Sequence, residues 1–527
     1  MRDYPESVAF LGQWGRFQQV VFFLLCATIV PNGFGAFNLV FLTDVPRHHC
    51  ALPDVNLTED WRDSIIPVQV VNGNQQLSRC SRFRLDVVRN LSAQGLVPGR
   101  DVNLTDLEQE GCVDGWSYSR DVYQSTIVSE FDLVCSEQWK LTFTSTVFFV
   151  GVLLGSFFSG QLSDRFGRKP VLFATMAVQM LFTFIQVFST SWVMFTVLLF
   201  INGLGQISNF VAALVLGTEI LTGHVRVLYS SMGACLSFTL GYMMLPIFAF
   251  LLRDWTSLLL ALSLPCLAFL PLWWFIPESP RWLLSQGRVE EAERIVRTAA
   301  KWNKVQAPLV IFEEAGLERK LQRLRPGEDQ EHQNHNPPPL PGDLHADPYM
   351  SCFISAAVEV PAYISGWLVL RYFPRRPSIC CSFLLEAVSL FLIQLVPQTL
   401  TNLSIALEML AKYFITVTFS MMFAYIAELY PTLLRNTAVG ICSTAGRLGN
   451  CIAPYLVTLN TYLLHLPYIV IGSLGIVAAF AALFIPETFG RPLPETMQQM
   501  HQRERMKCPC VTGKQTPIPV ELLDSPL

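Results

Sequence analysis

Gly160-Gln161-Leu162-Ser163-Asp164-Arg165-Phe166-Gly167-Arg168-Lys169 is a short basic turn between two long apolar runs, Phe143–Phe158 and Val171–Phe188. Each run belongs to a stretch of about 20 mostly apolar residues, the length that crosses a bilayer. Two spans joined by so few residues form a hairpin. Because cytoplasmic loops are rich in arginine and lysine, the turn is expected on the cytoplasmic face. The stretch predicts a multi-pass membrane protein with a cytoplasmic N-terminus.

The composition agrees with a membrane protein. Hydrophobic residues make up 51% of the 527 residues and charged residues 15%, against about 25% charged residues in soluble domains. The formal net charge of −4 argues against a nucleic-acid partner. Residues 1–19 lack the apolar core of a cleavable signal peptide. The first apolar run is therefore expected to remain as an anchor.

Hydropathy predicts eleven membrane spans, six in the first half of the chain and five in the second. The expected spans are 20–42, 142–162, 171–190, 193–216, 228–251, 256–276, 350–370, 378–397, 403–427, 438–459 and 467–485. This pattern predicts an all-α membrane protein. Its expected parts are a cytoplasmic N-terminus (1–19), an N-terminal bundle (20–276), a loop and tether (277–348), a C-terminal bundle (349–486) and a tail (487–527).

A long hydrophilic insert, residues 43–141, follows the first span. It contains four cysteines and three glycosylation sequons, a combination typical of an extracellular loop held by disulfides. The residues concerned are Cys50, Cys80, Cys112 and Cys135, with Asn56, Asn90 and Asn103. Two disulfides are expected, and four cysteines allow three pairings among which the sequence does not choose.

A second insert, residues 277–348, follows the sixth span. Apolar residues recur at helical spacing from Val289 to Ala299, which predicts an amphipathic cytoplasmic helix. After Lys320 the chain is rich in proline, asparagine and charge, and this composition predicts a flexible tether. No apolar run occurs between that helix and Leu344.

Several phrases resemble a known family. The pattern G-x(3)-D-R-x-G-R-K of residues 160–169 resembles the signature loop of the major facilitator superfamily. Longer phrases resemble its organic-ion branch, and within that branch the organic cation/carnitine transporters. They are Phe148–Ser156, Gly205–Asn209, Trp273–Leu283, Val358–Tyr363 and Ala427–Thr432. The resemblance covers nearly all of the chain except about 312–343, and it implies two bundles of six helices.

The seventh of the twelve helices implied by the resemblance is missing from the hydropathy pattern. If the remaining spans insert in sequence, all later helices are inverted, and the basic residues after the span 350–370 face outside, against the positive-inside rule. Alternatively, the later helices keep the family orientation although the insert does not span normally. The sequence leaves both alternatives open.

Arg447 is the leading candidate for substrate binding, because a lone guanidinium within an apolar span needs an anionic partner. The resemblance implies arginine here in carnitine carriers and an acid in cation carriers. A structural ion pair with Glu386 or Glu408 is the alternative. Carnitine also carries a quaternary ammonium, which aromatic rings attract. The aromatic candidates, placed by the resemblance, are Phe210, Phe238, Phe419, Phe423 and Tyr425.

Oxygen-bearing side chains at membrane depth are candidates for sodium coupling. They are Asn32, Gln179, Gln206, Ser208, Asn209 and Glu428. For Glu428, a gate or a structural salt bridge is the alternative. Sodium is the expected coupling ion, and no other cofactor or metal is expected.

The basic turn is expected to act in gating, through contacts that form in one state and break in the other. The resemblance implies that Asp164, Arg165, Arg168 and Lys169 pair with neighbouring helix ends. The expected partners are Glu219, Arg226, Glu278 and Arg281, and Arg435, seven residues after Glu428, is a further gating candidate.

The sequence therefore predicts a sodium-coupled plasma-membrane carrier of carnitine and related zwitterionic or cationic solutes, working by alternating access. The alternatives are a sodium-independent organic cation facilitator and a non-transporting variant that lacks one helix. An enzyme is not expected, since no nucleophile, base or metal ligands occur at suitable spacing. Residues 217–224 lack the lysine and hydroxyl of a nucleotide loop. No feature supports a scaffold-protein partner.

Overall fold

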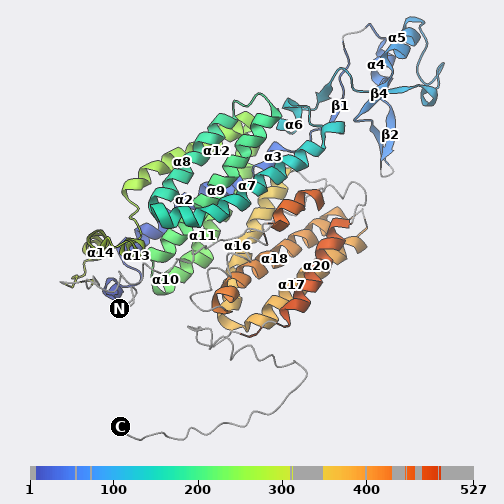
Figure 1. Cartoon of the computed structure of the whole chain (residues 1–527). Helices are drawn as coiled ribbons and strands as arrows, with labels where there is room; N and C mark the ends of the chain where they lie inside the picture. Colours follow the sequence, from blue (N-terminus) through green and yellow to red (C-terminus); the bar gives the residue numbers. More distant parts are fainter. Residues whose placement is uncertain are drawn as a thin grey trace, which may run out of the picture.

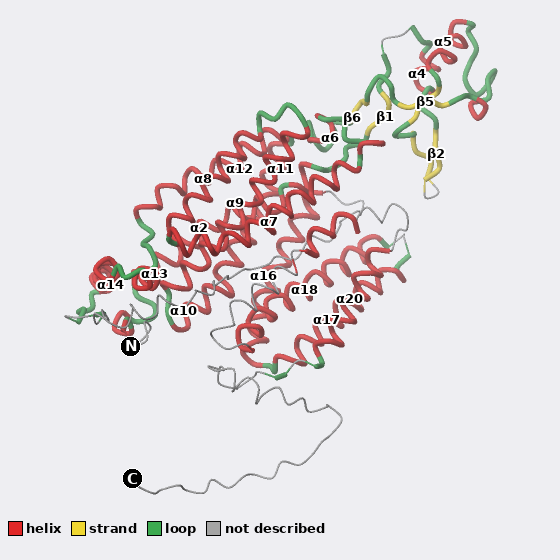
Figure 2. The backbone as a smooth tube through the Cα atoms, in the orientation of Figure 1, coloured by secondary structure: helices red, strands yellow, loops and turns green. Residues whose placement is uncertain are grey.

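Two bundles of long apolar helices and a small strand-containing insert make up the described part of the chain (Figure 1, Figure 2). The computed structural model describes residues 7–53, 56–71, 74–308, 311–312, 348–397, 400–429, 446, 448–456, 466–484 and 486–487. Among these residues, nine helices are long and apolar enough to cross a membrane. The expected all-α membrane fold is confirmed.

The N-terminal bundle contains six of these helices, close to the expected spans. Its long elements are α2 (Arg16–Phe37) with its continuation α3 (Leu39–Leu42), α7 (Trp139–Phe166), α8 (Arg168–Gln186), α9 (Trp192–Ile220), α11 (Ala234–Leu252) and α12 (Trp255–Phe269). Three short elements complete it: α10 (Gly223–Leu228), the π-helix η4 (Tyr229–Gly233) and the 3₁₀-helix η5 (Leu270–Trp274).

Glycines allow α2 and α11 to pack backbone against backbone. A Cβ atom on Gly33 would lie 2.2 Å from the carbonyl oxygen of Phe238, and one on Gly241 would lie 2.1 Å from that of Val30. Small residues at such crossings are the usual means of tight helix association in a bilayer. This close crossing sets the position of α11 relative to the C-terminal bundle.

The C-terminal bundle contains four described helices within about three residues of the expected spans. They are α16 (Pro348–Tyr372), α17 (Arg375–Leu395), α18 (Thr401–Leu429) and the shorter α20 (Leu466–Ala482). The expected span 438–459 lies largely outside the described residues, although residues 448–456 are helical. The helix pairs α17/α18 and α17/α20 make the most extensive contacts in this bundle.

We name the two ends of the N-terminal bundle by what they carry. The insert end carries residues 43–134, and the basic end carries the turn Asp164–Lys169. Figure 1 shows the insert beyond one end and the helices α13 (Pro280–Ser285) and α14 (Val289–Asn303) beyond the other. The helix expected from the apolar spacing after Val289 is α14, which buries Ala292, Val296, Ala299 and Ala300.

The insert is a small unit of three antiparallel strand pairs and short helices. The strands are β1 (His48–Cys50) with β6 (Trp116–Tyr118), β2 (Val68–Val71) with β3 (Asn74–Leu77), and β4 (Ser81–Phe83) with β5 (Gln109–Gly111). The helices are α4 (Glu59–Ser64), α5 (Leu85–Ala93), α6 (Ile127–Glu130), η2 (Leu104–Asp106) and η3 (Cys135–Glu137). Trp61, Ile65, Phe83 and Val88 form its apolar core.

A buried arginine and two disulfides fasten the insert. The guanidinium of Arg82 donates to Glu110 at 2.8 Å, to Asp114 at 2.5 Å and to the Ala51 carbonyl at 3.0 Å. The disulfides join Cys50 to Cys112 and Cys80 to Cys135. The structure thus selects one of the three pairings that the sequence left open.

The direction of α16 distinguishes the two alternatives for the later helices. At its start, the Tyr349 hydroxyl donates to the Val122 carbonyl at 3.2 Å and its ring stacks on Phe41 at 5.5 Å, so this residue lies at the insert end. Farther along, α16 contacts η4, which follows α10 at the basic end. The helix therefore runs from the insert end to the basic end, which is the family orientation.

The ends of α12 and the start of α16 show at which end of the bundle the second insert begins and ends. Asp254 at the start of α12 accepts a hydrogen bond from Ser125 of the insert, and Trp273, just past α12, packs on Phe173 and lies beneath Lys169 of the basic turn. Both α12 and α16 therefore run from the insert end to the basic end. Residues 313–347, where the seventh helix was expected to be missing, lie outside the described residues.

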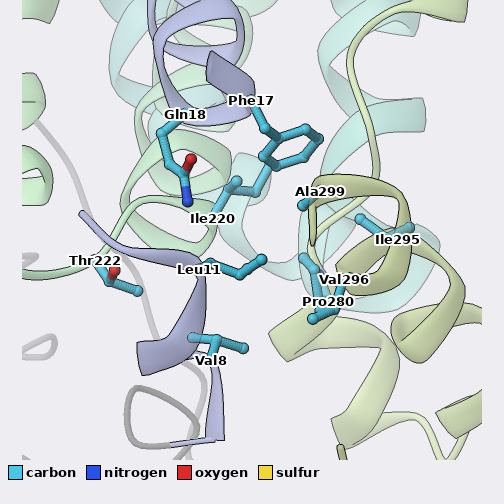
Figure 3. A pocket seen from close by; sticks show the side chains of 10 residues that line it. All are labelled: Val8, Leu11, Phe17, Gln18, Ile220, Thr222, Pro280, Ile295, Val296 and Ala299. Atoms are coloured by element: carbon cyan, nitrogen blue, oxygen red, sulfur yellow. The ribbon is translucent and has the colours of Figure 1, made fainter. Parts of the chain in front are cut away.

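A small cavity lies beneath the N-terminal segment at the basic end, beside the 3₁₀-helix η1 (Ala9–Leu11). Figure 3 shows Val8 and Leu11 on one side, Phe17 and Ile220 above, and side chains of α13 and α14 on the other. Its lining is mainly apolar, and none of the sequence-predicted site residues lines it.

Candidate functional site

Arg168 at the start of α8 forms the centre of an ion-pair cluster at the basic end. Its guanidinium donates to Glu219, at the end of α9, at 3.1–3.3 Å, and it also pairs with Asp164 one turn earlier. The Arg168 side chain is 8% exposed. The structure thus brings together three residues that the sequence assigned to gating.

Glu278 binds the backbone of the same turn rather than a side-chain cation. Its carboxylate accepts hydrogen bonds from the N–H groups of Arg168 at 3.1 Å, Lys169 at 3.2 Å and Ser279 at 2.9 Å. Gly167 has a φ of +105°, and a Cβ atom there would lie 2.6 Å from this carboxylate. Burial raises the pKa of Glu278 above its usual value, although the backbone hydrogen bonds act in the opposite direction.

Four other predicted gating residues lie in the described part of the chain, and one lies outside it. Arg165 is exposed with its guanidinium near the Phe166 ring, and Lys169 lies over the ring of Trp273 at 4.7 Å. Arg226 and Arg281 are exposed. Arg435 lies outside the described residues.

Four of the predicted coupling residues meet in the middle of the N-terminal bundle. The Asn32 amide donates to Asn209 Oδ1 at 2.8 Å, and Gln206 donates to the Asn32 carbonyl at 2.7 Å. Gln179 and Gln206 both lie beside Gly35. The side-chain oxygen of Asn32 is buried and accepts no hydrogen bond from the described residues.

Two predicted coupling residues are not in this amide cluster. The Ser208 hydroxyl donates to the carbonyl oxygens of Leu204 at 2.8 Å and Gly155 at 3.2 Å, on the side of α9 that faces α7. The side chain of Glu428 lies outside the described part.

A buried ion pair, which the sequence analysis missed, lies in the C-terminal bundle. Lys412 of α18 lies 3.1 Å from Glu359 of α16, and each side chain is 5% exposed. Lys412 also hydrogen-bonds Ser355. Both charges lie inside apolar spans, and charged residues there mark functional sites by default because their burial is costly. That signal was present in the sequence.

The ion pair touches the N-terminal bundle across the interface between α11 and α16. Thr239 of α11 donates to Glu359 at 3.1 Å, and Lys412 lies 4.9 Å from the ring centroid of Tyr242. These contacts join residues of both bundles at mid-helix. Separation of the bundles at this level removes the contacts of Thr239 and Tyr242 and exposes the ion pair.

An aromatic cluster extends from this point into the N-terminal bundle. Phe37 stacks on Tyr242 with ring centroids 3.9 Å apart, and Phe238 meets Phe37 at 6.0 Å and Phe210 at 5.9 Å. Phe210 and Phe238 were predicted to bind substrate. Phe37 and Tyr242 were missed, because the resemblance drew attention to other positions.

The remaining predicted substrate residues do not join that cluster. Tyr425 donates to the Pro486 carbonyl at 2.7 Å and lies 13 residues beyond Lys412, about 20 Å along a helix. Phe419 is half-buried on α18. Arg447 and the side chain of Phe423 lie outside the described residues, while Glu386 and Glu408, the alternative partners of Arg447, are buried.

The three sequon asparagines, Asn56, Asn90 and Asn103, are exposed on the insert. They are therefore accessible on the folded unit. Their modification stays a prediction.

Two helical bundles that meet around buried charges, with a clamped basic turn at one end, define a membrane transporter of the major facilitator type. Residues 109–320 match the family described as "Sugar (and other) transporter", and residues 337–518 match "Major Facilitator Superfamily". The partially occluded inward-open xylose transporter XylE from E. coli shares this fold. Its TM-score is 0.59 at 15% identity, covering 90% of this chain and 100% of that one.

More specific relatives identify the family. The chain is 49% identical to solute carrier family 22 member 4 of Mus musculus, covering 100% of this chain and 99% of the relative. It is 50% identical to organic cation/carnitine transporter 2 of Rattus norvegicus, covering 95% and 94%, and 49% identical to the protein of that name from Homo sapiens, covering 96% and 95%. The chain belongs to the organic cation/carnitine transporter family. It is a multi-pass membrane transporter and not an enzyme.

Proposed function

We propose that this protein is a plasma-membrane carrier of carnitine and related zwitterionic or cationic solutes, working by alternating access with sodium as the coupling ion. The names of the relatives support the substrate class. The single observation that carries the mechanism is the buried Glu359–Lys412 pair at the interface of the bundles. We further propose that the basic end faces the cytoplasm and the insert end faces outside.

A zwitterionic substrate can bind between the two residues of the ion pair and replace each of them as the partner of the other. Separating a buried pair costs about 3–5 kcal/mol when one charge is left alone. A ligand with an ammonium and a carboxylate satisfies both residues at once, with the ammonium at Glu359 and the carboxylate at Lys412. The ring of Tyr242 adds cation–π attraction for a quaternary ammonium. Arg447 remains a second candidate for the carboxylate.

The amide cluster is the proposed sodium site. The unpartnered side-chain oxygen of Asn32 lies buried among the amides of Gln206 and Asn209, and hard cations are bound by such carbonyl oxygens. The amide cluster lies on α2, α8 and α9, while Phe37 of α2 and Phe210 of α9 belong to the aromatic cluster. Ion binding there would therefore order the wall of the substrate site.

Labelled-carnitine uptake with and without sodium tests the proposal. Glu359→Gln and Lys412→Gln each leave one buried charge unpaired, so both uptake and thermal stability fall. In the double variant E359Q/K412Q the charges are balanced again, so stability recovers while uptake stays lost. Ser389→Ala, which removes a buried hydroxyl bonded within α17, is the matched control. Wild-type uptake by the double variant would contradict the exchange of partners.

A sodium titration tests the amide cluster separately. Asn32→Ala is expected to raise the sodium concentration needed for half-maximal uptake at least about tenfold, since losing one charge-bearing contact of about 1.5 kcal/mol has that effect. Uptake that is independent of sodium in the wild-type chain would leave a facilitator, and the coupling proposal would be wrong.

A further inference from the structure

Glu386 is a buried acid that the proposed transport mechanism does not use. It lies halfway along α17, about 15 Å from either end of the helix, and the residue is 5% exposed. Its Oε2 atom is buried and has no hydrogen-bond partner among the described residues. No described cation lies within ion-pairing distance of it.

The face of α17 that carries Glu386 is apolar apart from the hydroxyls of Ser382 and Ser389. Ile379 and Leu390 are buried on the same side of the helix, and Ala387 is buried beside Glu386. Ala387 contacts Gly475 of α20, and Leu390 packs with Ala411 of α18 in one apolar cluster. The carboxyl group is thus enclosed by three helices and not by the interface between the bundles.

The charged and titratable groups on the neighbouring helices are already engaged. On α18, Lys412 pairs with Glu359 at 3.1 Å, and the Tyr413 hydroxyl donates to Ser365 at 2.8 Å. Glu408, also on α18, is buried and makes a contact of its own. On α20, Tyr468 is buried near the start of the helix. On α17 itself, Cys380 lies nearly two turns before Glu386.

An ionised carboxylate is the costly form in this position. Charge at the depth of the bilayer without a counter-ion costs several kcal/mol, and a neutral carboxylic acid avoids most of that cost. A metal ion would need several oxygen ligands. The flanking hydroxyls of Ser382 and Ser389 instead donate to carbonyl oxygens one turn back in the same helix.

We propose that Glu386 is a proton-binding site of the C-terminal bundle. In the packed arrangement of α17, α18 and α20 the carboxyl group holds a proton. When these helices separate enough to admit water, the O–H bond breaks and the proton passes to the solvent, leaving the carboxylate ionised. Proton occupancy therefore favours the packed arrangement, and alkaline conditions favour its opening.

Infrared spectroscopy of the purified full-length protein in lipid tests the protonation state directly. The difference spectrum between the wild type and Glu386→Gln at neutral pH is expected to contain the carbonyl stretch of a protonated carboxylic acid. That band must persist in the control variant Glu408→Gln. A difference spectrum showing the loss of an ionised carboxylate instead would overturn the proposal.

Thermal unfolding against pH is the second measurement, and it does not depend on transport. A glutamate in an unfolded chain releases its proton above a pH of about 4, so unfolding releases the proton and wild-type stability falls as pH rises. Glu386→Gln keeps a neutral side chain and is expected to lose that part of the pH dependence. Identical pH profiles for the two proteins would overturn the proposal, whether or not the chain carries carnitine.

Discussion

Asn303, the last residue of α14, accepts a hydrogen bond from the backbone N–H of Phe17 at a distance of 2.9 Å. The same amide donates to the Leu11 carbonyl at 3.1 Å and to the Gln18 side chain at 2.8 Å. A residue of the second insert thus caps the first turn of α2, 286 positions earlier. This contact holds the N-terminal segment over the basic end.

Asn303→Ala is expected to lower the free energy of unfolding by about 1–2 kcal/mol, as the loss of a helix N-cap does. Gly15→Ala is expected to be at least as damaging, because its Cβ atom would lie 2.2 Å from the Asn303 side chain. In the double variant the clash is removed, so its loss should be smaller than the sum of the two. Thermal unfolding of the purified variants measures this coupling, and additive losses would argue against it.

Gly241→Ala is expected to separate α2 from α11 and to cost about 1–3 kcal/mol, the usual range for overpacking. Uptake should fall too, because Thr239 and Tyr242 on the same helix contact the ion pair. Gly449→Ala is the control, since a Cβ atom there meets no atom of the described residues within 4 Å. Surface expression and uptake of both variants check the prediction; equal behaviour would contradict it.

Arg168→Lys is expected to reduce uptake strongly although the charge is kept. A lysine cannot serve Asp164 and Glu219 together as the forked guanidinium does, so one of these two carboxylates loses its contact with residue 168. The exposed Arg165→Lys should have little effect. Accessibility of introduced cysteines at the basic end, with and without substrate, reports the gating role. If the accessibility of these cysteines is the same in Arg168→Lys as in the wild type, the ion-pair cluster contributes to stability and not to gating.

His48 in β1 is expected to make the insert sensitive to acid. Burial lowers the pKa of its imidazole below the usual 6.5, although the hydrogen bond to the Pro46 carbonyl acts in the opposite direction. The folded insert therefore binds fewer protons than the unfolded chain, and stability falls as pH drops below about 6.5. Hydrogen exchange of β1 and β6 at pH 7 and pH 5 measures this loss. His48→Gln should abolish it, and an unchanged pH dependence would contradict the assignment.

The spans and the amphipathic α14 were predictable because they depend on local apolar spacing. The approach of Arg168 to Glu219 followed from the family pattern of the turn. The disulfide pairing and the direction of α16 were not predictable, because both are decided by long-range packing, such as Tyr349 against Phe41. The hydropathy of the second insert carries no information about which end of the bundle the chain reaches next.

Glu359 and Lys412 were missed for a different reason. Each is a single charge in a long apolar run, the same signal that identified Arg447. Their pairing is invisible in sequence because 53 positions separate them and only the packing of the parallel helices α16 and α18 brings them within 3.1 Å. A rule that treats every intramembrane charge alike would have named them.

Helix α16 belongs to two hydrophobic cores. Tyr349, Cys352 and Ala356 pack within the core of the N-terminal bundle, whereas Ala362 packs within that of the C-terminal bundle. Pro361 lies at the change-over, where the missing N–H removes a helical hydrogen bond. Pro361 is therefore a point at which the helix can bend, so that its second half can move with the C-terminal bundle while Tyr349 at its start keeps its contact with Phe41 at the insert end.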